Sequence, residues 1–202
     1  MNAGATTARV YEALKELVTC REFRPGDRVD PAALAERLAS SVTPVRDALN
    51  LLTGEGLIES RMASGYFLPQ LDEPSLKDML AWSGQIVGVI LRNWEPRPVI
   101  DWDRIADREP AYPARMRDAF EVLALASPNE EHRRALAAIG ARLHAVRHVE
   151  PQIFEFAEKE ALAFELAIDR SDRAEIRRIS GYYHRSRARA ASALVRAVYR
   201  AD

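Results

Sequence analysis

Apolar side chains recur every three or four residues through most of this chain, which is the spacing of amphipathic helices. The first such stretch predicts a helix over 7–21, with an inward face made of Val10, Leu14, Leu17 and Val18. The stretch "FRPGDRVD" follows, and its Pro-Gly pair predicts a turn that ends this helix.

The next segment predicts two short helices and a hairpin. A helix fits Pro31 to Ala39, because proline is tolerated in a first turn. After the break "SSVT" another helix begins, with Ser41 or Thr43 as its cap and Pro44 in its first turn. "GEG" ends that helix, and "LIESRMASGYFLPQ" predicts two short strands around a Ser-Gly tip. This order is typical of a helix-turn-helix unit with a wing, and the alternative is a small helical domain that binds no nucleic acid.

Helical periodicity resumes after the linker "QLDEP" and predicts an all-helical second domain. We expect helices over about 74–94, 114–126, 129–149, 150–170 and 172–200. The segment 94–113 holds four prolines and two tryptophans, so we expect an irregular packed connection there. Three tryptophans are expected as core or interface anchors: Trp82, Trp94 and Trp102. The predicted fold class is mainly α, with domains at 1–70 and 71–202.

Composition narrows the class of protein without naming a function. The chain has 202 residues, a formal net charge of −1 and one cysteine, Cys20, so no intrachain disulfide can form. The first residues lack the apolar run of a signal peptide, and "SGQIVGVIL" is too short to span a bilayer. We therefore expect a soluble, cytoplasmic protein with no membrane partner. No nucleophile–base pairing, phosphate loop or metal-ligand spacing predicts an enzyme.

The stretch from "YEALKELV" to "SGYFLP" resembles the winged helix-turn-helix domain of GntR-family transcriptional regulators. The pieces "RPGDRV", "LAERL", "TPVRDAL" and "EGLIE…GYF" carry this resemblance in order and spacing. The helical remainder, with "SPNEEHRRAL" and "DRSDRAEIRRISGYYH", resembles the FCD-type effector domain of the FadR subfamily. The resemblance implies a homodimeric repressor that binds a double-stranded DNA operator and is released by a small carboxylate effector.

The helix that starts near Ser41 is expected to enter the major groove of DNA. Hydroxyls, a guanidinium and free N–H groups at a helix start suit base edges and phosphates, and a glycine in the wing lets the backbone approach DNA closely. The resemblance implies DNA contacts at similar positions, and the residues expected to contact DNA are Ser41, Thr43, Pro44, Arg46, Arg37, Arg61 and Gly65.

Two departures from the family pattern weaken this expectation. Val42 and Ala32 stand where the family usually has arginines that contact DNA. Residues 1–70 also hold eight basic and nine acidic side chains, a formal net charge of −1. We expect modest DNA affinity or an unusual operator. The alternative is a degenerate regulator that acts mainly through protein–protein interaction.

Many FCD domains hold a divalent metal through one aspartate and three histidines. The resemblance places Arg117 at the aspartate position, and Glu121, Ala161 and His184 at the three histidine positions. Only one of these four residues matches, so we predict that the metal cofactor has been lost. A residual site made of Glu121 and His184 is the alternative.

Inward-facing arginines are the other candidate feature of the second domain. Periodicity places Arg187 within an apolar stripe, Arg147 close to another and His184 beside the first. A buried guanidinium needs an acidic partner or an acidic ligand. The candidate effector-binding residues are Glu121, Arg147, His184 and Arg187. Alternatively, the arginines pair with Glu121, Glu165 or another acid, or face a dimer partner. His144 and His148 lie four residues apart and are expected on a solvated face.

Overall fold

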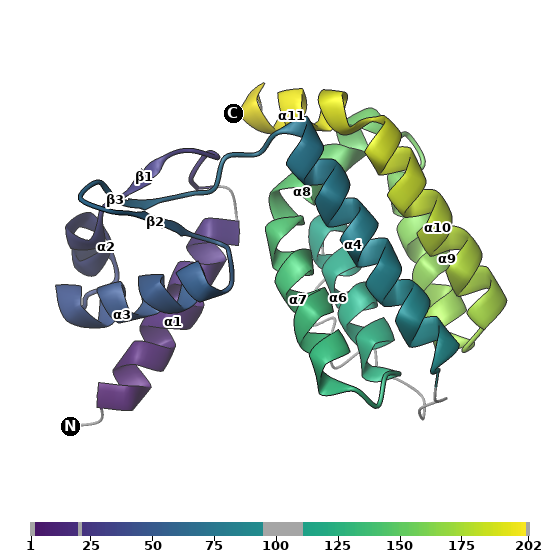
Figure 1. Cartoon of the computed structure of the whole chain (residues 1–202), viewed down its shortest axis with the longest axis horizontal. Coiled ribbons are helices and arrows are strands. Elements are labelled where there is room, and N and C mark those ends of the chain that lie inside the picture. The colour runs from purple at the N-terminus through teal and green to yellow at the C-terminus, as the bar shows by residue number, and fades with distance from the viewer. Residues whose placement is uncertain (1–2, 20–21, 95–110, 201–202) are drawn as a thin grey trace. The chain divides into compact units, whose positions relative to one another are not determined.

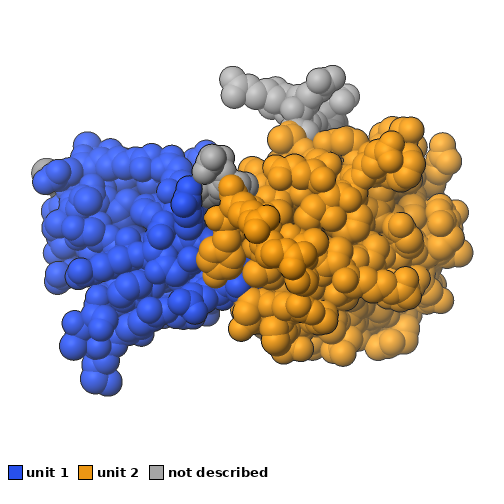
Figure 2. Space-filling view, turned by 90° about the horizontal axis from the view of Figure 1, so that it is seen from above, with its two compact units in different colours: residues 1–71 blue, residues 72–202 orange. Residues whose placement is uncertain are grey.

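The computed structural model describes residues 3–19, 22–94 and 111–200. The chain divides into two compact units, Met1–Leu71 and Asp72–Asp202 (Figure 2). The sequence placed this boundary one residue earlier. Most of the predicted connection 94–113, with Trp102, lies outside the described residues.

The described residues of the first unit form three helices and a three-stranded sheet (Figure 1). The helices are α1 (Ala3–Thr19), α2 (Pro31–Arg37) and α3 (Val42–Gly54). The strands β1 (Arg28–Val29), β2 (Glu59–Arg61) and β3 (Gly65–Phe67) form an antiparallel sheet in the order β1-β3-β2. Packing of α1 against α3 buries a core that includes Leu14, Val45, Leu49 and Leu52, each 0% exposed.

Two features of this unit differ from the sequence prediction. Strand β1 was not predicted, because two residues are too few to show an alternating pattern. The tip of the hairpin is not Ser-Gly, since Gly65 is the first residue of β3. Met62, 97% exposed, and Ala63, with φ +60°, form the turn instead. The turn is closed by a hydrogen bond from the Ser64 N–H to the Arg61 carbonyl oxygen at 2.9 Å.

The second unit is a helical bundle. Its described helices are α4 (Glu73–Arg92), α6 (Tyr112–Leu125), α7 (Glu130–Arg142), α8 (His144–Ile153), α9 (Ala157–Asp169), α10 (Arg173–Arg189) and α11 (Ala191–Arg200). Helix α4 lies between α7 and α10, and α6 packs against α7, α8 and α9 (Figure 1). The mainly helical fold class and the N-terminal winged helix-turn-helix are as the sequence predicted. Within the described residues, no helix is both long and apolar enough to cross a membrane.

Three of the predicted helices are wrong in extent. The helix expected over 129–149 is broken at Leu143, and the one expected over 172–200 is broken at Ala190. The helix expected from 150 begins at Ala157, because Phe154 adopts an extended conformation after α8. The apolar period continues across the two breaks since both flanking pieces face the same core, so periodicity alone could not detect them. Trp82 is 52% exposed and lies outside the core.

Candidate functional site

The first turn of α3 carries exposed polar side chains that make no hydrogen bond to another described side chain. Ser41 is the N-cap residue, which is one of the two predicted alternatives, but its side chain makes no capping hydrogen bond. Ser41 and Thr43 are both exposed, and Pro44 is half-buried in the first turn. A helix start without a side-chain cap leaves backbone N–H groups and hydroxyls available to an anion.

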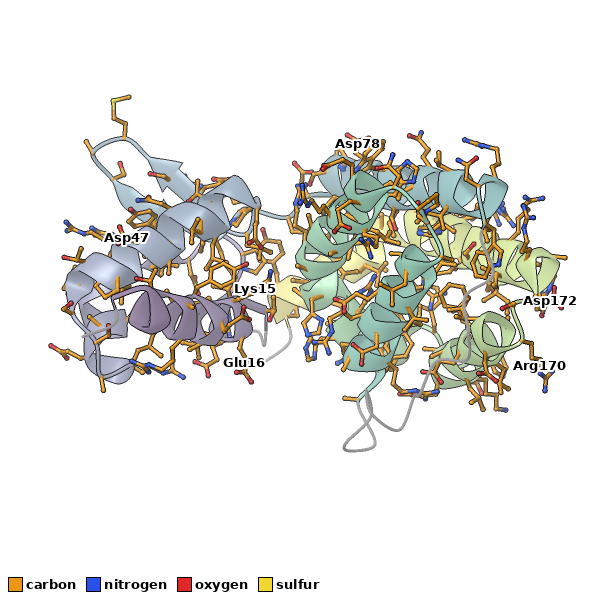
Figure 3. All side chains as sticks on the ribbon, turned by 90° about the horizontal axis from the view of Figure 1, so that it is seen from below. Lys15, Glu16, Asp47, Asp78, Arg170 and Asp172 are labelled. Carbon is orange, nitrogen blue, oxygen red and sulfur yellow. The ribbon has the colours of Figure 1, made fainter. Side chains whose placement is uncertain are left out.

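Arg46 extends this polar surface along α3. It is exposed and makes no hydrogen bond or ion pair with any described residue. The neighbouring Asp47, labelled in Figure 3, is also exposed. Arg37 differs from Arg46 because it forms an ion pair with Glu22. Arg46 is therefore the predicted DNA-contacting arginine with the most available charge.

One face of the wing carries two further arginines. The Arg61 guanidinium lies 4.4 Å from the centre of the Phe67 ring and pairs with Glu59 at 3.0 Å. Arg28 is paired with Phe67 in the sheet, so the two arginines share that face. A Cβ atom built at Gly65 would lie 3.7 Å from the Arg28 Nε, so Arg28 reaches the start of β3.

Arg28 was missed by the sequence analysis, which treated "RPGDRV" as a turn. Its position follows from β1, whose pairing with β3 is a tertiary contact. Arg28 and Arg46 have no acidic partner among the described residues, whereas Lys15, labelled in Figure 3, pairs with Glu55 at 2.9 Å.

The wing is tied directly to α3. The Tyr66 hydroxyl donates a hydrogen bond to Asn50 Oδ1 at 2.8 Å. Tyr66 lies on the opposite face of β3 from Phe67, because side chains alternate along a strand. This bond fixes the spacing between α3 and the strand that carries the wing.

In the second unit, Arg187 is neutralised by two acids. Its Nε donates to Glu150 Oε2 at 3.1 Å and its Nη1 lies 2.5 Å from Glu160 Oε2. Arg187 and Glu150 side chains are each 1% exposed. Two tyrosine hydroxyls complete the cluster, since Tyr112 donates to Glu150 Oε2 at 2.5 Å and Tyr183 to Oε1 at 3.0 Å.

The pKa values in this cluster respond to burial and to charge together. Burial lowers the pKa of Arg187, but the Glu150 carboxylate and its neighbours outweigh burial and raise that pKa overall. Burial raises the pKa of Glu160, and the Arg187 charge opposes this shift. Arg187 therefore has acidic partners within the chain, one of the alternatives left open by the sequence, although the partners are Glu150 and Glu160.

Arg147 and Glu121 are placed differently from each other. Arg147 is 1% exposed, and its Nη1 donates to the Gly140 carbonyl oxygen at 3.5 Å. No ion pair joins Arg147 to any described acid, and its buried Nε has no hydrogen-bond partner among them. Glu121 is exposed, so it does not share a cavity with these arginines. The residue of α6 that faces His184 is Phe120, with 5.7 Å between ring centres.

His184 is buried at 7% exposure, with both ring nitrogens engaged. Its Nδ1 lies 2.7 Å from the Ser180 carbonyl oxygen, so Nδ1 carries a hydrogen and donates it. Its Nε2 then accepts from the Ser83 hydroxyl at 3.0 Å. Burial lowers the pKa of His184 to about 4.

The other positions that the resemblance assigns to metal ligands differ in burial. Ala161 is 1% exposed and Arg117 is exposed. Within the part of the chain that the structure describes, no three His, Cys, Asp or Glu side chains lie close enough together to hold a metal ion. His144 is not on a solvated face as expected, being only 7% exposed, and its Nε2 lies 3.2 Å from the His148 Nε2. Burial lowers the pKa of His144 to about 3.

A groove of about 900 Å³ lies between α4, α7 and α10. His184 lines it, together with apolar and basic side chains. Arg147, Arg187 and Glu121 do not line this groove. Of the four residues predicted to bind an effector, only His184 lines this groove.

The chain is similar to bacterial transcriptional regulators. Residues 6–68 match the family model described as bacterial regulatory proteins, gntR family. The Nta operon transcriptional regulator of Aminobacter aminovorans is 42% identical to this chain over 57 residues, which is 28% of this chain and 27% of that protein. The HTH-type transcriptional regulator Rv0043c of Mycobacterium tuberculosis is 26% identical over 152 residues, which is 72% of this chain and 61% of that protein. The chain thus spans about a quarter and about three-fifths of the lengths of these relatives.

Solved structures extend the likeness to the whole fold. The E. coli protein McbR/YncC has a TM-score of 0.65 at 17% identity, and the alignment covers 98% of this chain and 100% of that one. A GntR transcriptional regulator structure from Rhodococcus sp. RHA1 has a TM-score of 0.63 at 16% identity and covers 93% of this chain and 97% of that one. At such identities the likeness supports the fold alone.

Proposed function

We propose that the chain is a sequence-specific transcriptional regulator, because residues 6–68 match the family model described as bacterial regulatory proteins, gntR family. The observation that carries the proposal is the exposed first turn of α3, where Ser41, Thr43 and Arg46 are free of side-chain partners within the described residues. Polar side chains at the start of a helix are what a recognition helix presents to base edges.

The regulator acts as a dimer on a palindromic operator. One α3 enters the major groove of each half-site, and Arg46 contacts a base edge or a phosphate. The wing face that carries Arg28 and Arg61 lies along the adjacent backbone, with Met62 at its tip. Two such units bind half-sites one helical turn apart, about 34 Å.

Repression is relieved by a small acidic metabolite that binds the helical unit. The arginines of that unit that have no acidic partner among the described residues support this part of the proposal. Binding would shift the population of bundle conformations and change the spacing of the two DNA-binding units.

A degenerate regulator that acts through protein–protein contacts is the second candidate. Val42 and Ala32, in place of arginines, favour it, as does the net charge of −1 over residues 1–70. Such a protein would retain the fold but neutralise few phosphates.

Electrophoretic mobility shifts with the DNA upstream of its own gene test the proposal. The full-length chain should form a specific complex whose association constant falls steeply as salt rises, because phosphate contacts release counterions. A scrambled fragment of the same length and base composition is the control. No complex even at low salt would rule out the DNA-binding function and leave the protein-interaction candidate.

A further inference from the structure

The groove between α4, α7 and α10 has the size of a ligand site. Its volume of about 900 Å³ falls within the range of pockets that hold small organic molecules. Leu80, Trp82 and Val89 of α4 contribute apolar surface, and Trp82 is 52% exposed. All of the residues that line the groove belong to the second unit.

Glycines keep this groove open. Gly88 of α4 lines it, and a Cβ atom built there would meet no atom within 4 Å. A Cβ at Gly84 would lie 3.4 Å from the ring of His184, so the groove floor is in contact with the buried histidine. Gly181 of α10 lies under the Arg185 guanidinium, whose Nη1 would be 3.0 Å from an added Cβ.

Three arginines line the same groove without acidic partners. Arg92, Arg177 and Arg185 are exposed and form no ion pair with any described residue. Elsewhere on the same helices, arginines are neutralised: Arg178 pairs with Glu175 at 2.6 Å. Glu131, the acid that lines the groove, is itself paired with Arg134 at 2.8 Å.

We propose that this groove binds a small amphipathic organic anion. Its apolar body packs against Trp82 and the glycine-lined floor, and its carboxylate, sulfonate or phosphate is held by the guanidinium of Arg185 with Arg92 or Arg177. The proposal deepens the effector part of the proposed function, but binding itself requires no DNA.

A matched pair of fluorescent probes tests the charge requirement on the full chain. The anion 8-anilinonaphthalene-1-sulfonate should bind a single site, and N-phenyl-1-naphthylamine, which has the same apolar body without the sulfonate, should bind more weakly. Arg185→Gln should weaken binding of the sulfonate about tenfold, since one charge-assisted contact is lost, and change binding of the amine by about twofold or less. Arg170→Gln is the control, because Arg170 (Figure 3) is an exposed arginine of the same unit that does not line the groove.

A second variant tests the location by shape. Gly88→Leu fills the groove from a helical position with open space, so it should abolish binding of both probes while the thermal midpoint is kept.

Equal sulfonate affinity in wild type, Arg185→Gln and Gly88→Leu would overturn the proposal. So would a change of oligomeric state in Gly88→Leu during sedimentation without a change in probe binding, because a second copy would then occupy the groove. Preferential binding of the chain to phosphatidylglycerol vesicles through the same residues would assign the groove to a membrane lipid and also overturn it. Loss of operator binding with probe binding intact would contradict the DNA-binding function alone.

Discussion

Arg187 of α10 and Glu150 of α8 form an ion pair at 3.1 Å, although each side chain is only 1% exposed. Removing one partner of such a pair leaves the other charge buried and uncompensated, which costs more than the pair itself contributes. The pair therefore constrains how α8 and α10 pack, and Tyr112 adds α6 to the same cluster.

Glu150→Gln should lower the free energy of unfolding by about 3 kcal/mol, because it removes a buried charge that faces Arg187. Urea unfolding followed by circular dichroism measures the change. Glu175→Gln is the control, since Glu175 forms a surface pair with Arg178 and should leave the unfolding midpoint unchanged. Similar midpoint shifts in the two variants would show that the buried Glu150 pair contributes no more to stability than the surface pair.

Arg147→Met and Arg187→Met should differ in their effect on the free energy of unfolding. Methionine fills a similar elongated space, and Arg147 has no ion pair with a described acid, so its replacement should stabilise the protein or leave it unchanged. Arg187→Met should destabilise by about 3 kcal/mol, because it leaves Glu150 and Glu160 without their cation. Differential scanning calorimetry gives both values, and a lower midpoint for both variants would contradict the contrast.

Stability should fall as the pH drops below 6.5. The pKa of His184 is lowered to about 4 in the folded state, so between pH 6.5 and 4 the unfolded state binds a proton that the folded state excludes. The stabilisation is present above pH 6.5 and is lost through this window, with a slope of up to about 1.4 kcal/mol per pH unit. His144, whose pKa is lowered to about 3, acts in the same direction.

His184→Gln tests that pH dependence, because glutamine cannot titrate and its amide is still able to accept from Ser83. The slope of unfolding free energy against pH between 6.5 and 4.5 should be shallower than in the wild type. An unchanged slope would show that His184 is not among the groups that destabilise the protein in acid.

Neighbouring charges on α3 should have opposite effects on operator binding. Arg46→Gln should weaken binding about tenfold, and should reduce the salt slope by about one if the guanidinium contacts a phosphate. Asp47→Asn should strengthen binding, since it removes a negative charge from the same exposed surface. Asp78→Asn, on α4 of the other unit (Figure 3), is the matched control for Asp47. Fluorescence anisotropy with a labelled operator measures the affinities. Equal operator affinities for all three variants would contradict this prediction.

Tyr66→Phe removes the hydroxyl that holds the wing to α3. We expect the loss of one hydrogen bond, about 1 kcal/mol, to loosen β3 and to weaken operator binding about fivefold. Amide hydrogen exchange in β2 and β3 should accelerate while α1 stays protected. Unchanged exchange in the hairpin would indicate that packing alone positions the wing.

Much of the first unit could be predicted because its signals are local. Proline in the first turns of α2 and α3, and the apolar spacing of Val45, Leu49 and Leu52, lie within single elements. The order of helices and the hairpin followed from these patterns. Arg28 could not be placed, since its position depends on the pairing between β1 and β3. The paired residues of these two strands are 37 to 39 residues apart along the chain.

In the second unit the sequence determined the helical class and the inward direction of Arg147 and Arg187, because an apolar period marks the buried side of a helix. Only the tertiary structure decided their partners. Glu150 lies 37 residues from Arg187, and Phe120 rather than Glu121 faces His184, because helix packing and rotation select among neighbouring positions. Periodicity reports which side of a helix is buried, but the contact between two buried side chains depends on the angle and offset at which their helices pack.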